Sequence, residues 1–106
     1  MMKSKLLLQL KNNWIVDLEH LMYIRVDGHY LSFYIDDLTE PIIVRDSLKN
    51  IMDHLPFEFF MRVHRSYIIN IAFIKKLSHQ SVILKNDCKI PLSRNHDLRE
   101  RVRVVS

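Results

Sequence analysis

Residues 59–77, FFMRVHRSYIINIAFIKKL, form a long apolar stretch with one polar interruption at residues 62–66. The interruption places two arginines, a histidine and a serine between Phe60 and Ile68. Charged side chains are almost never fully buried without a partner, because an unpaired buried charge is strongly destabilising. We therefore expect the interruption to reach the surface while the flanking apolar residues anchor it in the core. Basic groups braced in this way could hold an anion or the edge of a base.

The length and composition of the chain indicate one folded domain. Of its 106 residues, 48% are hydrophobic and 26% are charged, as in soluble globular proteins. No apolar run approaches the roughly 20 residues needed to cross a bilayer, and no signal-peptide pattern opens the chain. The single cysteine, Cys88, cannot form an internal disulfide. These features predict a cytoplasmic protein that does not use a membrane.

Charge is distributed unevenly along the chain. Residues 1–59 contain six Lys or Arg and nine Asp or Glu, whereas residues 60–106 contain ten and three. Basic charge therefore gathers in the half that contains the interrupted apolar stretch. This is the electrostatic pattern of a protein that binds a polyanion. Charge alone is equally compatible with a solvated basic surface.

Short apolar or alternating runs between turn-forming residues predict many short strands. We expect strands at residues 5–10, 14–16, 22–27, 30–35, 42–44, 74–78, 82–84 and 88–92. Asp27 and Gly28 predict a hairpin turn, because glycine readily adopts positive φ. His29 then lies at the lip of that hairpin. The pattern is typical of a mostly antiparallel β domain.

One helix is predicted at residues 47–55, where apolar residues recur at helical spacing. These residues are Leu48, Ile51, Met52 and Leu55. Asp46 or Ser47 can cap the first turn of this helix. Ser93 is expected to cap a second short helix at the end of the chain, although the β-branched residues 102–105 would also suit a strand.

The sequence does not predict an enzyme. It contains no HExxH zinc motif, no GxSxG nucleophile motif and no glycine-rich phosphate loop. His64 and Ser66 are two residues apart on what reads as one strand, and two neighbouring polar groups do not make a nucleophile and its base. We therefore predict no catalytic residue, no metal site and no cofactor.

Three positions in predicted turns or strand ends carry side chains suited to nucleic acid. These are His29 beside the hairpin turn, Arg65 in the polar interruption, and Arg94 at the start of the last element. Arginine can donate two hydrogen bonds to guanine, and histidine or asparagine can bond base edges or phosphate. Arg94, followed by Asn95, would oppose the dipole of a helix that began there, which indicates a nearby anion. Taken alone, His29 is more simply a solvated loop residue.

Residues 60–70 closely resemble the signature of the LytTR DNA-binding domain family, F-x-R-x-H-R-S-x-[IV]-[IV]-N. In that family an isoleucine follows after a short gap, matched here by Ile74. Further landmarks are the YIR strand at 23–25, the DGHY turn at 27–30, the helix at 47–55 and the IPLSR segment at 90–94. The resemblance runs from about residue 5 to residue 104. We therefore predict a single LytTR-type domain over these residues, with a short N-terminal lead at 1–4.

The resemblance implies about ten short strands in small packed antiparallel sheets, with one or two short helices. It also implies that loops enter successive major grooves of a bent duplex, without a recognition helix. The expected base contacts are His29, Arg65 and Arg94, and the expected phosphate contacts are Ser66, Ser93 and Asn95. Arg62 and His64 are expected to brace the loop, and Asn70 to be structural.

The same resemblance implies a role in the cell. LytTR domains are output modules of bacterial response regulators in two-component systems, and two copies typically occupy direct repeats upstream of a promoter, where they can form a homodimer on DNA. Most family members carry a receiver domain before this module. None precedes residue 5 here, so we expect a free-standing protein or an output domain separated from its receiver.

Two other functions are compatible with the sequence. An RNA-binding or single-stranded DNA-binding β module would need exposed aromatic rings on one sheet face, on which bases could stack. The four tyrosines Tyr23, Tyr30, Tyr34 and Tyr67 could be arranged in that way. A protein-interaction domain would show no salt-dependent affinity for nucleic acid.

Overall fold

The computed structural model describes residues 6–94, 98–103 and 105. Its strands are β1 (Leu7–Gln9), β2 (Ile15–Asp17), β3 (Leu21–Asp27), β4 (Tyr30–Ile35), β5 (Ile42–Arg45), β6 (Phe60–His64), β7 (Tyr67–Asn70), β8 (Ile74–Leu77), β9 (Ser81–Leu84) and β10 (Lys89–Pro91). The helical elements are α1 (Leu48–Met52) and the 3₁₀ helices η1 (Ile71–Phe73) and η2 (Leu98–Arg101). The predicted fold of about ten short antiparallel strands is confirmed. None of the helices in the described residues is long and apolar enough to span a membrane.

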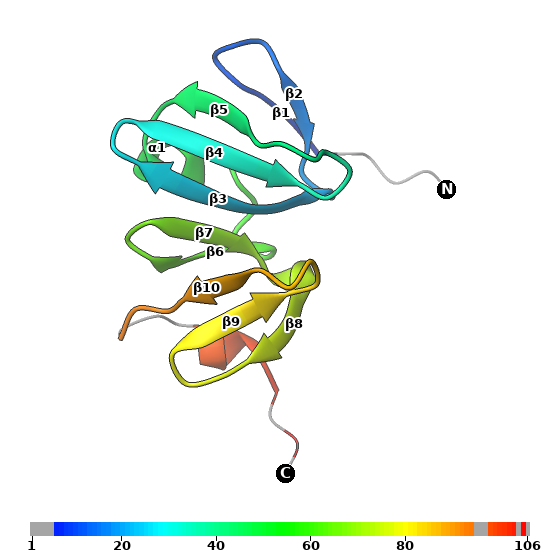
Figure 1. Cartoon of the computed structure of the whole chain (residues 1–106), viewed down its shortest axis with the longest axis vertical. Helices are drawn as coiled ribbons and strands as arrows, with labels where there is room; N and C mark the ends of the chain where they lie inside the picture. The colour runs from blue at the N-terminus through cyan, green and yellow to red at the C-terminus, as the bar shows by residue number, and fades with distance from the viewer. Residues whose placement is uncertain (1–5, 95–97, 104, 106) are drawn as a thin grey trace.

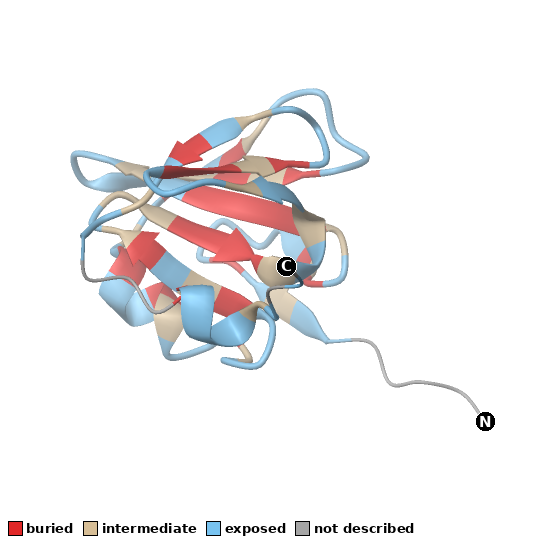
Figure 2. Ribbon diagram, turned by 90° about the horizontal axis from the view of Figure 1, so that it is seen from below, coloured by how far each residue is buried: buried red, intermediate tan, exposed pale blue. Residues whose placement is uncertain are grey.

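A five-stranded sheet in the order β5-β4-β3-β7-β6 lies between two hydrophobic clusters. On one face, residues of the β1–β2 hairpin and of α1 complete the first cluster. On the other face, the three-stranded sheet β10-β9-β8 and η2 complete the second. Figure 1 shows the two smaller sheets at opposite ends of the molecule, and Figure 2 shows that the buried segments lie mostly on strands while most of the connecting loops are exposed.

The central strand β3 departs from the strict alternation that the sequence predicted. Four consecutive residues, 21–24, are buried. The pairing of β3 with β4 shifts register between Leu21 and Tyr23, which places Met22 and Tyr23 together in the second cluster. A β-bulge inserts one unpaired residue and re-aims the side chains around it. The strand therefore serves both cores where the sheet is covered on both faces, and becomes exposed at Arg25.

The long apolar stretch at residues 59–77 forms a hairpin rather than a single strand. Strands β6 and β7 pair antiparallel through the two-residue turn Arg65-Ser66. Phe60 and Ile68 enter the first cluster, and Val63 and Ile69 enter the second. The hairpin is thus anchored in both cores, and the polar interruption emerges at its tip, as expected.

Asn70 ties three segments together where the apolar stretch leaves the central sheet. Its side chain is only 3% exposed. The amide nitrogen donates to the carbonyls of Leu18 and Leu21, and the amide oxygen accepts from the Ala72 N–H at 3.0 Å. Buried backbone groups need such partners, because an unsatisfied one is destabilising. Asn70 is therefore structural, in agreement with the prediction.

Helix α1 is shorter than predicted. Ser47 caps it by accepting from the Asn50 N–H at 3.1 Å, and the predicted apolar face is buried at Leu48 and Ile51. The N–H groups of residues 54 and 55 bond carbonyls three residues earlier. This tighter pattern is typical of a helix terminus and ends the regular helix at Met52.

The prediction of a helix capped by Ser93 is wrong in its starting point. The N–H groups of Leu92 and Ser93 donate to the carbonyls of Gln80 and Val63, which continues strand-like hydrogen bonding beyond β10. Among the described residues that follow, the helical turn η2 comprises Leu98–Arg101, and Leu98 is fully buried in the second cluster. The alternative of a strand at residues 102–105 is not seen at the three of those residues that the structure describes.

Candidate nucleic-acid interface

The β3–β4 turn presents His29 to solvent. Asp27 and Tyr30 pair across it, so Gly28 and His29 are its two central residues. Gly28 has φ +60° and His29 is not among the positive-φ residues, which is the pattern of a type II′ turn. The carbonyl of His29 accepts from the N–H of Asp46. The turn is therefore fixed by its backbone, and the imidazole stays exposed.

The β6–β7 turn presents Arg65 and Ser66. The Arg62 guanidinium donates to the carbonyl of Arg65 at 2.8 Å. The Ser66 N–H donates to His64 Nδ1 at 3.1 Å, so the neutral imidazole carries its proton on Nε2. The bracing role expected of Arg62 and His64 is thus visible as hydrogen bonds to the turn backbone. The Arg65 side chain remains exposed.

These two turns lie side by side. The N–H of Val26 donates to the carbonyl of Ser66 at 2.9 Å, which joins β3 to the start of β7. Residues 25–28 and 64–67 together line an open hollow of about 450 Å³. His29 and Arg65, far apart in sequence, are therefore presented at the same edge of the central sheet.

The segment after β10 reaches the same edge. The Ser93 N–H donates to the Val63 carbonyl at 2.8 Å, next to the strand end that leads into Arg65. Ser93 and Arg94 are both exposed. In Figure 1 the β3–β4 turn, the β6–β7 turn and the end of β10 follow one another down the left side. We call this side the turn edge; Asn95, the remaining predicted contact, lies outside the described residues.

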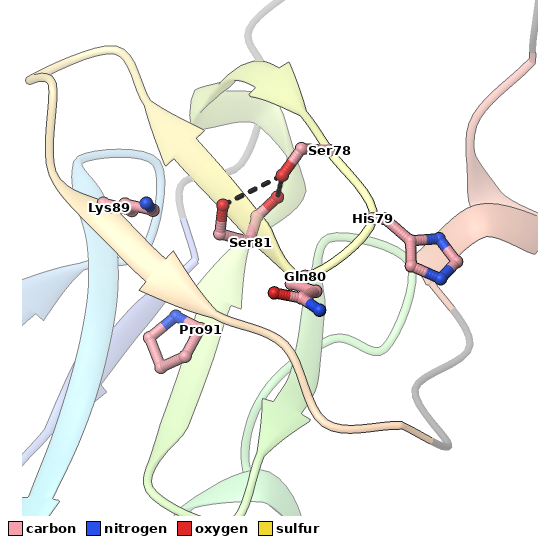
Figure 3. Close-up of a pocket in the computed structure, with 6 residues that line it drawn as sticks. All are labelled: Ser78, His79, Gln80, Ser81, Lys89 and Pro91. Carbon is pink, nitrogen blue, oxygen red and sulfur yellow. Dashed lines mark hydrogen bonds between the residues drawn. The ribbon is translucent and has the colours of Figure 1, made fainter.

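A further turn lies on this edge, between the strands predicted at 74–78 and 82–84, and the sequence did not predict its place there. The β8–β9 turn is joined to the chain after β10 by the bond from Leu92 N–H to the Gln80 carbonyl. With Lys89 and Pro91, the turn residues 78–81 line a hollow of about 470 Å³. Figure 3 shows Ser78 bonded to Ser81 at the base of the turn and His79 extending away from Lys89. The sequence carried no signal for this placement, because it depends on how two sheets pack.

Basic side chains beside His29 were also missed. Lys11 and Arg45 line a hollow of about 430 Å³ with His29, Asp46 and Ser47. Burial of Asp46 favours its neutral form, but hydrogen bonds from Ser47 and Asn50 and the Lys11 ammonium 3.7 Å away outweigh it and hold the pKa of Asp46 below its ordinary value. Lys11 is thus partly neutralised. No carboxylate of the described residues lies within ion-pair distance of Arg45.

The tyrosines do not form an open stacking platform. Tyr23 is 7% exposed and stacks on Tyr34 with ring centroids 4.3 Å apart, and its hydroxyl contacts the Cys88 sulfur at 3.4 Å. Burial and the Cys88 contact raise the pKa of Tyr23, so the phenol stays neutral. Tyr34 and Tyr67 are partly buried against the second cluster. Only Tyr30 is well exposed, which disfavours recognition of single strands by base stacking.

Comparisons with known proteins identify the family of this chain. Residues 11–101 match the LytTr DNA-binding domain family. The sensory transduction protein LytT of Bacillus cereus is 32% identical over 98 residues, which cover 85% of this chain and 39% of that protein. The Bacillus subtilis protein of the same name is 34% identical over 87 residues, covering 77% of this chain and 35% of that protein. The chain thus spans well under half the length of these relatives.

A solved structure shares the fold over nearly the whole chain. It is described as the LytTr DNA-binding domain of a Bacillus cereus response regulator, and it superimposes with a TM-score of 0.70 at 25% sequence identity. The match covers 94% of this chain and 95% of that one.

Proposed function

This chain belongs to the LytTR family of DNA-binding domains, and we propose that it binds double-stranded DNA sequence-specifically through its turn edge. The observation that carries the proposal is the convergence of three separate segments. The bonds Val26–Ser66 and Ser93–Val63 bring the β6–β7 turn beside the other two segments. Helix α1 begins beside the β3–β4 turn, where Ser47 lines a hollow with His29, but it is only five residues long, so we assign the contacts to the turns.

Each turn offers chemistry suited to DNA. The guanidinium groups of Arg65 and Arg94 can bond O6 and N7 of guanine, and the His29 imidazole can bond a base edge. The hydroxyls of Ser66 and Ser93 lie next to them along the chain and can donate to phosphate oxygens. Asn95 is assigned to phosphate as well, on its place in the sequence. Because the turns are spread along one edge, they would enter successive major grooves, and the duplex would bend toward the protein.

The proposed role in the cell is that of the output domain of a bacterial transcription regulator of the response-regulator type. Two copies would bind direct repeats at a promoter in the cytoplasm, with a homodimer forming on the DNA. The curated relatives are named as sensory transduction proteins, which supports a regulatory role for this domain.

Selection of bound duplexes from a random pool tests the proposal. We expect a single enriched motif, and we expect the selected duplex to compete far better than either of its single strands. Affinity should also fall steeply with salt, with a slope of log K against log[salt] of about −0.9 for each phosphate neutralised. A pool without enrichment, or stronger binding to single strands, would contradict duplex recognition.

Replacing His64 with phenylalanine should weaken DNA binding with little loss of stability. The ring stays next to Tyr67, whose centroid lies 5.8 Å away, but the acceptor for the Ser66 N–H is lost. Affinity for the selected duplex should fall by about 1–2 kcal/mol, because one of the two hydrogen bonds that brace the turn is lost. Fluorescence anisotropy and thermal unfolding measure the two quantities. His54→Phe is the matched control, since His54 is exposed beyond α1. Equal binding by both variants would show that the hydrogen bond from Ser66 to His64 does not contribute to DNA affinity.

A further inference from the structure

The hollow between the β3–β4 and β6–β7 turns contains a cationic side chain with no assigned role. Arg25 lies on β3 in this hollow, between the segments that carry His29 and Arg65. Its side chain is exposed, and no carboxylate of the described residues lies within ion-pair distance of it. An arginine in this state holds an unpaired positive charge at the surface.

The strand register surrounds Arg25 with hydrogen-bond donors. Arg25 is paired with Ser32 on β4 and with Tyr67 on β7, so these side chains lie next to it on the same sheet face. Both neighbours are partly exposed and carry hydroxyl groups. Together the three side chains form a row of donors across three strands. Such a row suits a ligand with several acceptor oxygens, and a phosphate is the usual one.

Duplex geometry places a phosphate here. Successive major grooves of a duplex are separated by the minor groove and the two sugar–phosphate strands that border it. If the two turns enter successive major grooves, one of these strands must pass the hollow between them. We infer that Arg25 binds a phosphate of that strand and holds the duplex between the two reading turns. The inference rests on the proposed function and adds to it a role for Arg25, which the sequence analysis placed in the YIR strand without assigning it a contact.

One charge in the hollow opposes this assignment. The carboxylate of Asp27 also lines it, two residues along β3 from Arg25. Arg25 and Arg65 outnumber it, so the lining remains net positive. Asp27 should therefore weaken the contact without abolishing it, and Asp27→Asn should strengthen binding to any duplex.

Replacing Arg25 with alanine tests the inference on the whole chain. With the selected duplex, affinity should fall roughly tenfold, and the slope of log K against log[salt] should become shallower by about 0.9. A shuffled duplex of the same length should lose affinity by a similar factor, because phosphate contacts carry no sequence information. Arg25→Lys should retain the parent slope, since it retains the charge.

Lys85→Ala is the matched control. Lys85 is an exposed cation in the turn between β9 and β10, at the opposite end of β10 from Ser93, and its loss should leave the slope unchanged. If Arg25→Ala binds both duplexes with the parent's slope while Arg65→Ala binds weakly, the inference is wrong and the proposed function stands. If Arg25→Ala changes the preferred motif, Arg25 contacts a base and the phosphate assignment is wrong. If the parent shows no salt-dependent duplex binding, both proposals fail.

Discussion

Replacing Arg65 or Arg94 with alanine is expected to lower the affinity for the selected duplex by about 1–3 kcal/mol each, and to relax base preference at one position of the motif. Both side chains are exposed, and neither is part of a hydrophobic cluster. The substitutions therefore remove contacts to DNA without removing contacts within the domain. Repeating the selection with each variant would show which base position each arginine reads.

The two variants should relax different positions of the motif, because they stand on different turns. The free energy of unfolding should change by less than about 0.5 kcal/mol, as for other surface substitutions, and thermal unfolding measures it. Lys85→Ala removes the same charge away from the turn edge and should keep both affinity and motif. Parent-like binding by both arginine variants would mean that the reading surface lies elsewhere.

Replacing Asn70 with leucine is expected to have the largest effect on stability, a loss of about 2–4 kcal/mol. The substitution leaves the carbonyls of Leu18 and Leu21 and the N–H of Ala72 without their side-chain partner. A loss of this size should lower the Tm by about 10–20 °C in a domain of this length. Urea unfolding followed by circular dichroism measures the change in the free energy of unfolding.

Two further variants sharpen the Asn70 result. Asn70→Asp keeps an acceptor for Ala72 but turns an anion toward two carbonyls, so it should also be strongly destabilising. Asn50→Leu removes an exposed asparagine whose amide donates one side-chain hydrogen bond, to Asp46, and it should cost less than Asn70→Leu. If Asn70→Leu and Asn50→Leu were equally stable, the hydrogen bonds of Asn70 would not stabilise the fold more than those of a surface asparagine.

Much of the fold follows from local patterns in the sequence. Alternation, turn residues and the apolar face of 47–55 were sufficient to predict most of the strands and the helix. The errors occur where tertiary contacts decide. The bulge at Met22 lets β3 serve two cores, and strand-like bonds from Leu92 and Ser93 occupy the residues where the last helix was expected to start. Neither effect has a signal in the local sequence.

The candidate site was predictable only in part. His29, Arg65 and Arg94 were found because they stand next to turn signals or within a family motif, and the structure brings their segments to one edge. Arg25 was quoted only as part of the YIR strand and Arg45 was not singled out, because each is an ordinary strand residue by its own neighbours in sequence. Their position beside the turns depends on the pairing of β3, β4, β5 and β7, which the sequence pattern does not specify.

The central claim is that the β3–β4 turn, the β6–β7 turn and the segment after β10 form a single DNA-binding surface. Titration of the ¹⁵N-labelled domain with the selected duplex tests it most directly, because each amide reports its own contact. We expect the largest shifts at Gly28-His29, Arg65-Ser66 and Ser93-Arg94, with the acidic β4–β5 turn at 36–40 unchanged. Shifts centred on that turn or on α1, with the three turns unaffected, would contradict the claim.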